Sequence, residues 1–396
     1  MNEQIQKGIE LAERGEFEQA RGHFMALTGL PDRTPQANLW LARLAFAEGD
    51  SARALANIEA AEKTNPNDFE TKALKGLYYL QEGQHQKALP ILESVRSARP
   101  DLAFNYPNLS TCYRELDRLP EAIEAGRKAV TLGPQDPASH FALSQALAEN
   151  GDLEESVNEA LKTLELNPGH IMAYVFLGSL FRQMDDLDAV IELYREALQH
   201  VPEATPIREE LLELLFSKED FSAALEHASI LVEQRGSEKD YFYLAQCADK
   251  LDEDDIAEEA LLQVVDMSPD NWRPYFLLGE LYAKRGMGEA AVDAYAAAVE
   301  RDPENPDLRN DLGLTLVRTE RPAEGEPHLL KAIRLAPDMI EAVLNLAICY
   351  ATQEKWKPAK EQANLVIQKT EAGSDLHEEA KRLLVSIANA ESANSK

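Results

Sequence analysis

The sequence has few of the features that mark a secreted, membrane-spanning or nucleic-acid-binding protein. Among 396 residues there are three cysteines, Cys112, Cys247 and Cys349. They lie too far apart to suggest a disulfide framework and are typical of a reducing cytoplasm. No apolar run approaches the ~18 residues of a membrane span, and the polar start MNEQIQKGIELAERGEF has no signal-peptide core. We therefore expect a cytoplasmic protein with no membrane span.

Positive charge is also scarce. Lysine and arginine number 40 against 70 aspartates and glutamates, which gives a formal net charge of −30. Nucleic-acid binding relies on basic patches that release counterions, so we expect no nucleic-acid partner. A chain of this charge favours basic or neutral partners instead.

Signatures of catalysis and of bound cofactors are missing as well. The eight histidines show no HExxH or other paired-ligand spacing, and no GxSxG, Walker A or glycine-rich loop occurs. Acidic runs such as LDEDDIAEEA lack the residue order of a calcium loop and are better interpreted as solvated helix faces. We expect no enzyme activity, no cofactor and no metal.

What the sequence does contain is a 34-residue period. Small residues stand twelve positions before most of its prolines, and a second small residue stands twelve positions earlier again. The prolines that define the period are Pro66, Pro100, Pro134, Pro168 and Pro202, followed by Pro269, Pro303 and Pro337. The period extends to eleven copies, starting near residues 1, 35, 69, 103, 137, 171, 205, 238, 272, 306 and 340.

Each copy predicts two helices separated by a turn rich in glycine or aspartate. Helical spacing places the small residues where the two helices cross, and a proline ends the second helix. One pair of short helices buries too little apolar surface to be stable alone, so the copies must stack. The sequence therefore predicts an all-α solenoid of eleven helix pairs and one terminal helix. The three cysteines share repeat position 10 of their copies, so we expect them to be buried packing residues.

The pattern resembles the tetratricopeptide repeat. The copy that begins at Trp272 carries its apolar, small and proline positions at Tyr275, Leu278, Gly279, Tyr282, Ala291, Tyr295, Ala298 and Pro303. The resemblance implies a right-handed superhelical solenoid of antiparallel helix pairs over residues 1–373, with a capping helix and short polar tail at 374–396. It also implies a non-enzymatic scaffold that binds a protein or an extended peptide segment in a concave groove.

The seventh copy, residues 205–237, departs from the pattern. It has Leu212 where glycine or alanine is expected and Gly236 in place of proline, and it is one residue short. We expect a local change of superhelical pitch there. Simple sequence drift is the alternative.

In tetratricopeptide repeats the first helices line the groove, and the stripe formed by positions 5, 9 and 12 supports this assignment independently. An apolar zone in copies one to four consists of Ile5, Ile9, Leu39, Arg43, Phe46, Leu77, Leu80 and Phe104. A polar zone in copies four to six consists of Thr111, Arg114, Phe141, Gln145, Ser179 and Arg182, and Asn108 at repeat position 6 is a further candidate for peptide binding. An acidic zone in copies seven to nine consists of Glu209, Glu213, Phe242, Gln246, Asp249, Phe276 and Glu280.

Each zone has a plainer interpretation. Tight curvature would bury the apolar zone between copies, and the other two zones would be ordinary solvated surface. For the acidic zone we expect a partner segment that carries lysine or arginine beside an apolar side chain. Two other functions stay open: self-assembly into homo-oligomers through the groove, and regulation of a separate enzyme as its subunit.

Overall fold

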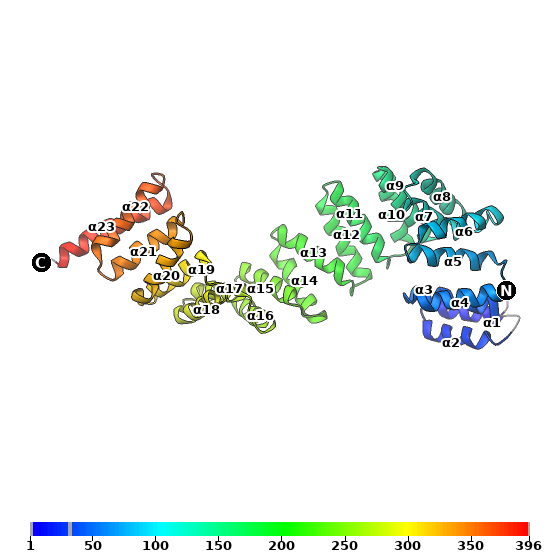
Figure 1. Cartoon of the computed structure of the whole chain (residues 1–396), viewed down its shortest axis with the longest axis horizontal. Coiled ribbons are helices and arrows are strands. Elements are labelled where there is room, and N and C mark those ends of the chain that lie inside the picture. The colour runs from blue at the N-terminus through cyan, green and yellow to red at the C-terminus, as the bar shows by residue number, and fades with distance from the viewer. Residues whose placement is uncertain (1–2, 31–33, 395–396) are drawn as a thin grey trace. The chain divides into compact units, whose positions relative to one another are not determined.

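The computed structural model describes residues 3–30 and 34–394 and divides the chain into two compact units, 1–207 and 208–396. Within the described residues it contains 23 α-helices and no strand (Figure 1). This confirms the all-α fold. The predicted polar tail lies partly outside the described residues, at 395–396.

The first unit holds six helix pairs in chain order. Neighbouring helices within and between these pairs pack against each other. Their bounds are α1 Glu3–Glu13, α2 Phe17–Leu27, α3 Thr34–Ala47, α4 Ser51–Thr64, α5 Phe69–Gln81, α6 His85–Ala98, α7 Asn105–Arg114, α8 Leu119–Leu132, α9 Pro137–Asn150, α10 Leu153–Leu166, α11 Ile171–Gln183 and α12 Leu187–His200.

The second unit begins inside α13, Thr205–Ser217, so the division falls in the divergent seventh copy. Its further helices are α14 Phe221–Gln234, α15 Glu238–Lys250, α16 Asp254–Met267, α17 Trp272–Lys284, α18 Gly288–Arg301, α19 Pro306–Arg318, α20 Pro322–Leu335, α21 Ile340–Thr352, α22 Trp356–Lys369 and α23 Asp375–Asn394. The last helix packs on α21 and α22, where its Ala380 joins a buried cluster with Val343, Leu344 and Val366.

The small residues lie at the crossing points within each helix pair, where the sequence predicts them. Ala291 is fully buried, and a Cβ added to Gly279 would lie 2.7 Å from Cδ1 of the Tyr295 ring. At Gly325 the added Cβ would lie 2.6 Å from the carbonyl oxygen of Gly313, so there the two backbones themselves are in close approach. Backbone approach of this kind requires small residues, because packed interiors have no spare volume.

The seventh copy exchanges large and small residues at one crossing. Leu212 stands where the ninth copy has Gly279, and Ala228 stands where that copy has Tyr295. Leu212 and Ala228 are both buried, at 1% and 0% exposure. The larger residue of the pair has thus moved from the second helix to the first, which keeps the packed volume of the hairpin similar. The change of pitch expected here stays a prediction.

The turn between the two helices of each copy uses the left-handed backbone region at repeat position 15. Five copies have glycine there and six have an acidic residue with φ between 56° and 62°. The glycines are Gly15, Gly49, Gly83, Gly151 and Gly286; the acidic residues are Asp117, Asp185, Glu219, Asp252, Glu320 and Glu354. Glycine enters this region freely, whereas a residue with a Cβ is strained in it.

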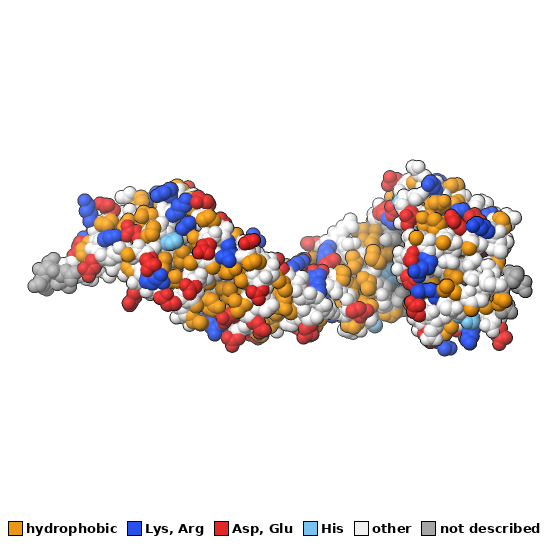
Figure 2. Space-filling model, turned by 60° about the horizontal axis from the view of Figure 1, so that its bottom comes forward, with side chains coloured by type: hydrophobic (Ala, Val, Ile, Leu, Met, Phe, Trp, Pro, Cys, Tyr) orange, Lys and Arg blue, Asp and Glu red, His pale blue; other side chains and the backbone are white. Residues whose placement is uncertain are grey.

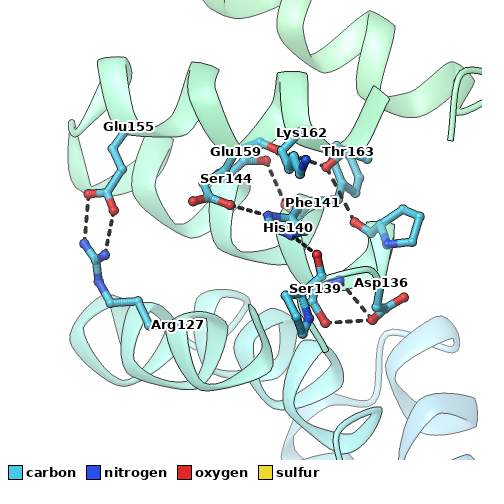
Figure 3. A network of polar contacts seen from close by, with 12 residues as sticks. Arg127, Asp136, Ser139, His140, Phe141, Ser144, Glu155, Glu159, Lys162 and Thr163 are labelled. Atoms are coloured by element: carbon cyan, nitrogen blue, oxygen red, sulfur yellow. Dashed lines mark hydrogen bonds and ion pairs between the residues drawn. The ribbon is translucent and has the colours of Figure 1, made fainter. Parts of the chain in front are cut away.

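Polar contacts connect consecutive copies in the first unit (Figure 3). Arg127 of α8 forms a double ion pair with Glu155 of α10, with N···O distances of 2.6 and 2.8 Å. Asp136 caps the first turn of α9. The buried His140 places Nδ1 2.5 Å from a carboxylate oxygen of Glu159 and Nε2 3.1 Å from the carbonyl oxygen of Pro134. Each nitrogen of this ring thus faces an acceptor, and the network fixes α9 between its neighbours.

Candidate functional site

The apolar zone of the first unit is filled largely by its own packing. Leu39 is only 6% exposed and belongs to a buried cluster against which Phe46 and Leu77 also pack. Ile5 and Ile9 are buried as well, at 4% and 7% exposure. The expectation that Leu39 contacts a peptide therefore disagrees with its burial, because neighbouring copies cover it.

Arg43 of this zone already has aromatic and acidic partners. Its guanidinium carbon lies 4.8 Å from the Trp40 ring centre and 5.5 Å from that of Phe104, and Nη2 is 3.3 Å from a carboxylate oxygen of Glu70. Burial lowers the pKa of Arg43, and the charge of Glu70 opposes that effect. Phe104 and Arg43 thus contact each other instead of presenting two separate groups to a partner.

The polar zone is also engaged internally. Both terminal nitrogens of Arg114 lie 2.5 Å from carboxylate oxygens, one from Glu149 and one from Glu115. Phe141 packs edge-on against Phe176 at 5.7 Å between ring centres. The side-chain amide of Asn108 donates to the carbonyl of Phe104 at 3.1 Å, the hydroxyl of Ser179 donates to the carbonyl of Phe176 at 2.6 Å, and the guanidinium carbon of Arg182 lies 5.9 Å from the Tyr194 ring centre. Thr111 and Gln145 are half-buried. Most of the predicted polar side chains thus already contact other groups of the chain.

The acidic zone divides into a neutralised part and an unneutralised part. Both glutamates of the seventh copy have a cationic partner: Lys239 of the eighth copy lies 2.8 Å from a carboxylate oxygen of Glu213, and Arg235 forms an ion pair with Glu209. These two glutamates therefore present little net charge. Sequence position alone did not indicate this, because Lys239 and Arg235 approach from outside the predicted stripe.

Farther along the second unit, carboxylates gather with little cationic compensation. The Glu280 side chain is exposed, yet surrounding protein crowds its carboxyl. Burial raises the pKa of Glu280, the charges of Asp311 and Asp249 add to that effect, and the charge of Lys250 opposes it more weakly. The pKa of Asp311 is raised too, by burial first and by the charges of Asp307 and Glu341. Three first helices thus contribute Asp249, Glu280 and Asp311 to one acidic region.

Two adjoining pockets lie along α15 and α17. The first, here called the acidic pocket, is a small hollow of about 50 Å³ lined by Ala245, Gln246, Asp249, Ala257, Leu261, Leu277, Glu280 and Leu281. The second, here called the aromatic pocket, is a broader and more open hollow of about 600 Å³ lined by Phe216, Ser237, Glu238, Lys239, Phe242, Tyr243, Gln246, Asn271 and Arg273. Gln246 lines both, so the two pockets are neighbours on α15 and α17, and they are together called the crevice below.

Sequence reasoning identified part of this crevice. Phe242, Gln246 and Glu280 line it as predicted, whereas Phe276 does not line either pocket. The Phe276 ring instead packs 5.8 Å from the Tyr295 ring centre, at the edge of a buried cluster. Sequence reasoning missed Arg273, because it stands at repeat position 2, outside the stripe of positions 5, 9 and 12.

The surface around these sites mixes both signs of charge. Figure 2 shows acidic and basic side chains interspersed over the visible face, with hydrophobic side chains between them. Among the described residues, no group of three or more histidine, cysteine, aspartate or glutamate side chains is arranged to hold a metal ion. The three cysteines are free and buried, and burial raises the pKa of Cys112 and of Cys247 to about 11. No helix in the described part of the chain is both long and apolar enough to cross a membrane.

Comparison with known proteins gives similarities of two kinds. At the sequence level, the chain is 21% identical over 346 residues to the anaphase-promoting complex subunit CDC16 of Saccharomyces cerevisiae, covering 84% of this chain and 37% of that protein. It is 21% identical over 321 residues to the BBSome complex member BBS4 of Bos taurus, covering 81% of this chain and 55% of that protein. The chain thus spans only part of the length of the curated relatives it matches.

Among solved structures, the APC/C hetero-tetramer Cut9–Hcn1 matches with a TM-score of 0.42 and 18% identity, covering 84% of this chain and 59% of that one. Family models described as tetratricopeptide repeat match residues 5–69, 42–103, 73–137 and 250–306, and a second such model matches 173–209. These matches together cover more than half of the chain. The chain belongs to the tetratricopeptide repeat family.

Proposed function

We propose that the protein is a non-enzymatic interaction scaffold that holds an extended segment of a partner protein in the crevice formed by the acidic and aromatic pockets. The observation that carries the proposal is the pairing, in one crevice, of aromatic surface at Phe242 and Tyr243 with the weakly compensated carboxylates Asp249 and Glu280. Aromatic side chains supply buried contact area, and the carboxylates select the sign of the partner.

The partner segment carries a lysine or arginine beside an apolar side chain. Ionised Glu280 is crowded by protein and by two like charges, so an incoming cation relieves both repulsion and lost hydration. The rest of the groove supports this choice indirectly. Arg43, Arg114, Glu209 and Glu213 already have partners of opposite charge within the chain.

The names of two relatives support a role in assembly. One is described as a subunit of the anaphase-promoting complex and the other as a member of the BBSome complex. The proposed role requires no catalysis, and the buried thiols with raised pKa values are poorly suited to act as nucleophiles. Free cysteines also support a reducing compartment such as the cytoplasm.

A peptide-array screen tests the proposal. The wild-type chain is expected to select peptides that carry a basic residue beside an apolar one, and Phe242→Ala is expected to lose most of that binding. Glu300→Lys, a charge reversal at an exposed position on α18 outside the crevice, is the matched control and is expected to bind as wild type does. If Phe242→Ala and the wild type select the same peptides equally well, the crevice is not the binding site.

Light scattering at increasing concentration tests self-assembly. A single monomer peak at high concentration supports binding of a separate partner. Growth of the apparent mass with concentration, abolished by Phe242→Ala, would mean that the crevice holds a second copy of this chain instead.

A further inference from the structure

We propose that the crevice along α15 and α17 binds a segment with charge of both signs: an acidic group at one end, a basic group at the other, and an apolar side chain between them. This inference rests on the proposed function and extends it, since that function requires only the basic and apolar groups. The proposed spacing between the two charged groups is three to five residues.

The end of the crevice at the start of the two helices presents one cation without an ion pair among the described residues, Arg273. Its side chain is exposed, and its guanidinium carbon lies 5.7 Å from the centre of the neighbouring Trp272 ring. Lys239 lines the same pocket and is already paired with Glu213 at 2.8 Å. The acidic residue lining this end, Glu238, accepts hydrogen bonds from Ser268 at 2.6 Å and Asn271 at 3.3 Å.

Helix polarity strengthens this end. Ser237 and Asn271 are the N-caps of α15 and α17, and both line the aromatic pocket. The first turn of α15 already holds Glu238 and Asp240, whereas the first turn of α17 has no acidic residue, so the N-terminus of α17 lies beside Arg273 without an acidic side chain of its own. Helix N-termini favour negative charge, so an acidic side chain or a chain-terminal carboxylate fits this end.

The opposite end of the crevice is acidic. Glu280 has no ion pair within the described residues, and Asp249 has one long contact of 3.7 Å to Lys284. That lysine lies closer to two other carboxylates, at 2.6 Å from Asp252 and 3.1 Å from Asp254. Lys284 therefore compensates Asp249 only partly, and the C-terminal halves of α15 and α17 also favour a cation.

The spacing follows from helix geometry. Lys239 and Asp249 are ten residues apart on α15, which corresponds to about 15 Å of helix rise, and Arg273 and Glu280 are seven apart on α17, about 10 Å. An extended peptide advances about 3.3 Å per residue, so 10–15 Å corresponds to roughly three to five residues. Between the two ends, Phe242 offers the apolar contact.

The test uses the full-length protein and three fluorescent peptides of equal length in an anisotropy titration. One peptide has glutamate and lysine four residues apart with leucine at the centre. The other two replace the pair by two lysines or by two glutamates. The wild type is expected to bind the mixed peptide about five-fold more tightly than the doubly basic one, and the doubly acidic one most weakly, in line with the small free energy of single exposed ion pairs.

Charge-reversal variants locate the two ends. Arg273→Glu is expected to weaken binding of the mixed peptide and to strengthen binding of the doubly basic peptide. Glu280→Lys is expected to reverse the order of the two uniformly charged peptides. Lys357→Glu and Glu300→Lys are matched controls at exposed positions outside the crevice, and they are expected to leave all three affinities unchanged.

Two different failures are distinguishable. If the mixed and doubly basic peptides bind equally and both are weakened by Phe242→Ala but not changed by Arg273→Glu, the segment binds without an acidic end. That result overturns this inference and leaves the proposed function standing. If no peptide responds to Phe242→Ala, the proposed function fails as well.

Discussion

Replacement of the strained acidic residues at repeat position 15 by glycine should stabilise the second unit. Glu219, Glu320 and Glu354 hold φ values of 61°, 62° and 56°. A residue with a Cβ is disfavoured in this region by roughly 1–2 kcal/mol, whereas glycine loses about 0.5–1 kcal/mol more backbone entropy on folding. The net gain expected for Glu320→Gly is therefore about 0.5–1 kcal/mol. The three sites lie in different copies, so a triple variant should gain roughly 1.5–3 kcal/mol.

Thermal unfolding followed by circular dichroism measures the effect. One kcal/mol corresponds to roughly 2–4 °C for a unit of this size, although repeat arrays can depart from two-state behaviour. The control is Glu320→Ala, which also removes a negative charge near the C-terminal end of α19 but retains the Cβ. Glycine must therefore stabilise more than alanine does. Equal midpoints for Glu320→Gly and Glu320→Ala would show that the left-handed backbone carries no strain, and the reasoning would be wrong.

Three further predictions concern packing and charge. Ala291→Leu should destabilise by ~1–3 kcal/mol through overpacking of a fully buried crossing, and Phe242→Ala should cost less in a denaturant titration; comparable losses would place Phe242 in the core. Ala228→Leu should be similarly destabilising alone and should recover when combined with Leu212→Ala; additive losses would mean that the two residues do not share a crossing. Glu280→Gln should stabilise the fold near neutral pH. Because the pKa of Glu280 is raised in the folded state, the wild-type fold loses stability as pH rises from the unfolded pKa through the folded one, and glutamine has no proton to lose. Below the unfolded pKa the variant should match the wild type, and a gain of equal size at both pH values would exclude this cause.

The fold was accessible from the sequence because its determinants are local and repeated. Residues 12 apart, such as Gly313 and Gly325, meet at the crossing of the two helices of one copy, and the period repeats this constraint along the chain. The divergent seventh copy was harder to interpret, because Leu212 was considered without Ala228. The compensating small residue lies sixteen positions later on the second helix, and the burial of both positions indicates the exchange of volume.

The site was predictable only in part, because side-chain partners are not encoded by the stripe of groove positions. The stripe placed Glu213 and Glu280 in equivalent roles at position 9 of their copies. Lys239, at position 2 of the next copy, neutralises Glu213. The equivalent position after Glu280 holds no cation, and the nearby charge of Asp311 raises the pKa of Glu280 instead. The difference depends on which long side chains reach across from the next copy, and this is a property of packing.

The charge of Glu280 connects stability with binding. Its ionised form is disfavoured by crowding and by two neighbouring carboxylates, so the free protein bears a cost for holding that charge in the crevice. A lysine or arginine of a partner would remove the same cost, since an opposite charge favours the ionised form. The electrostatic cost of ionised Glu280 in the free protein is therefore removed when the partner's cation binds, and its removal favours binding. Glu213, already paired with Lys239, offers no such gain because a partner's cation would first have to displace an internal one. Among acidic groove positions of the second unit, those without internal cations are thus the ones suited to recognise a partner.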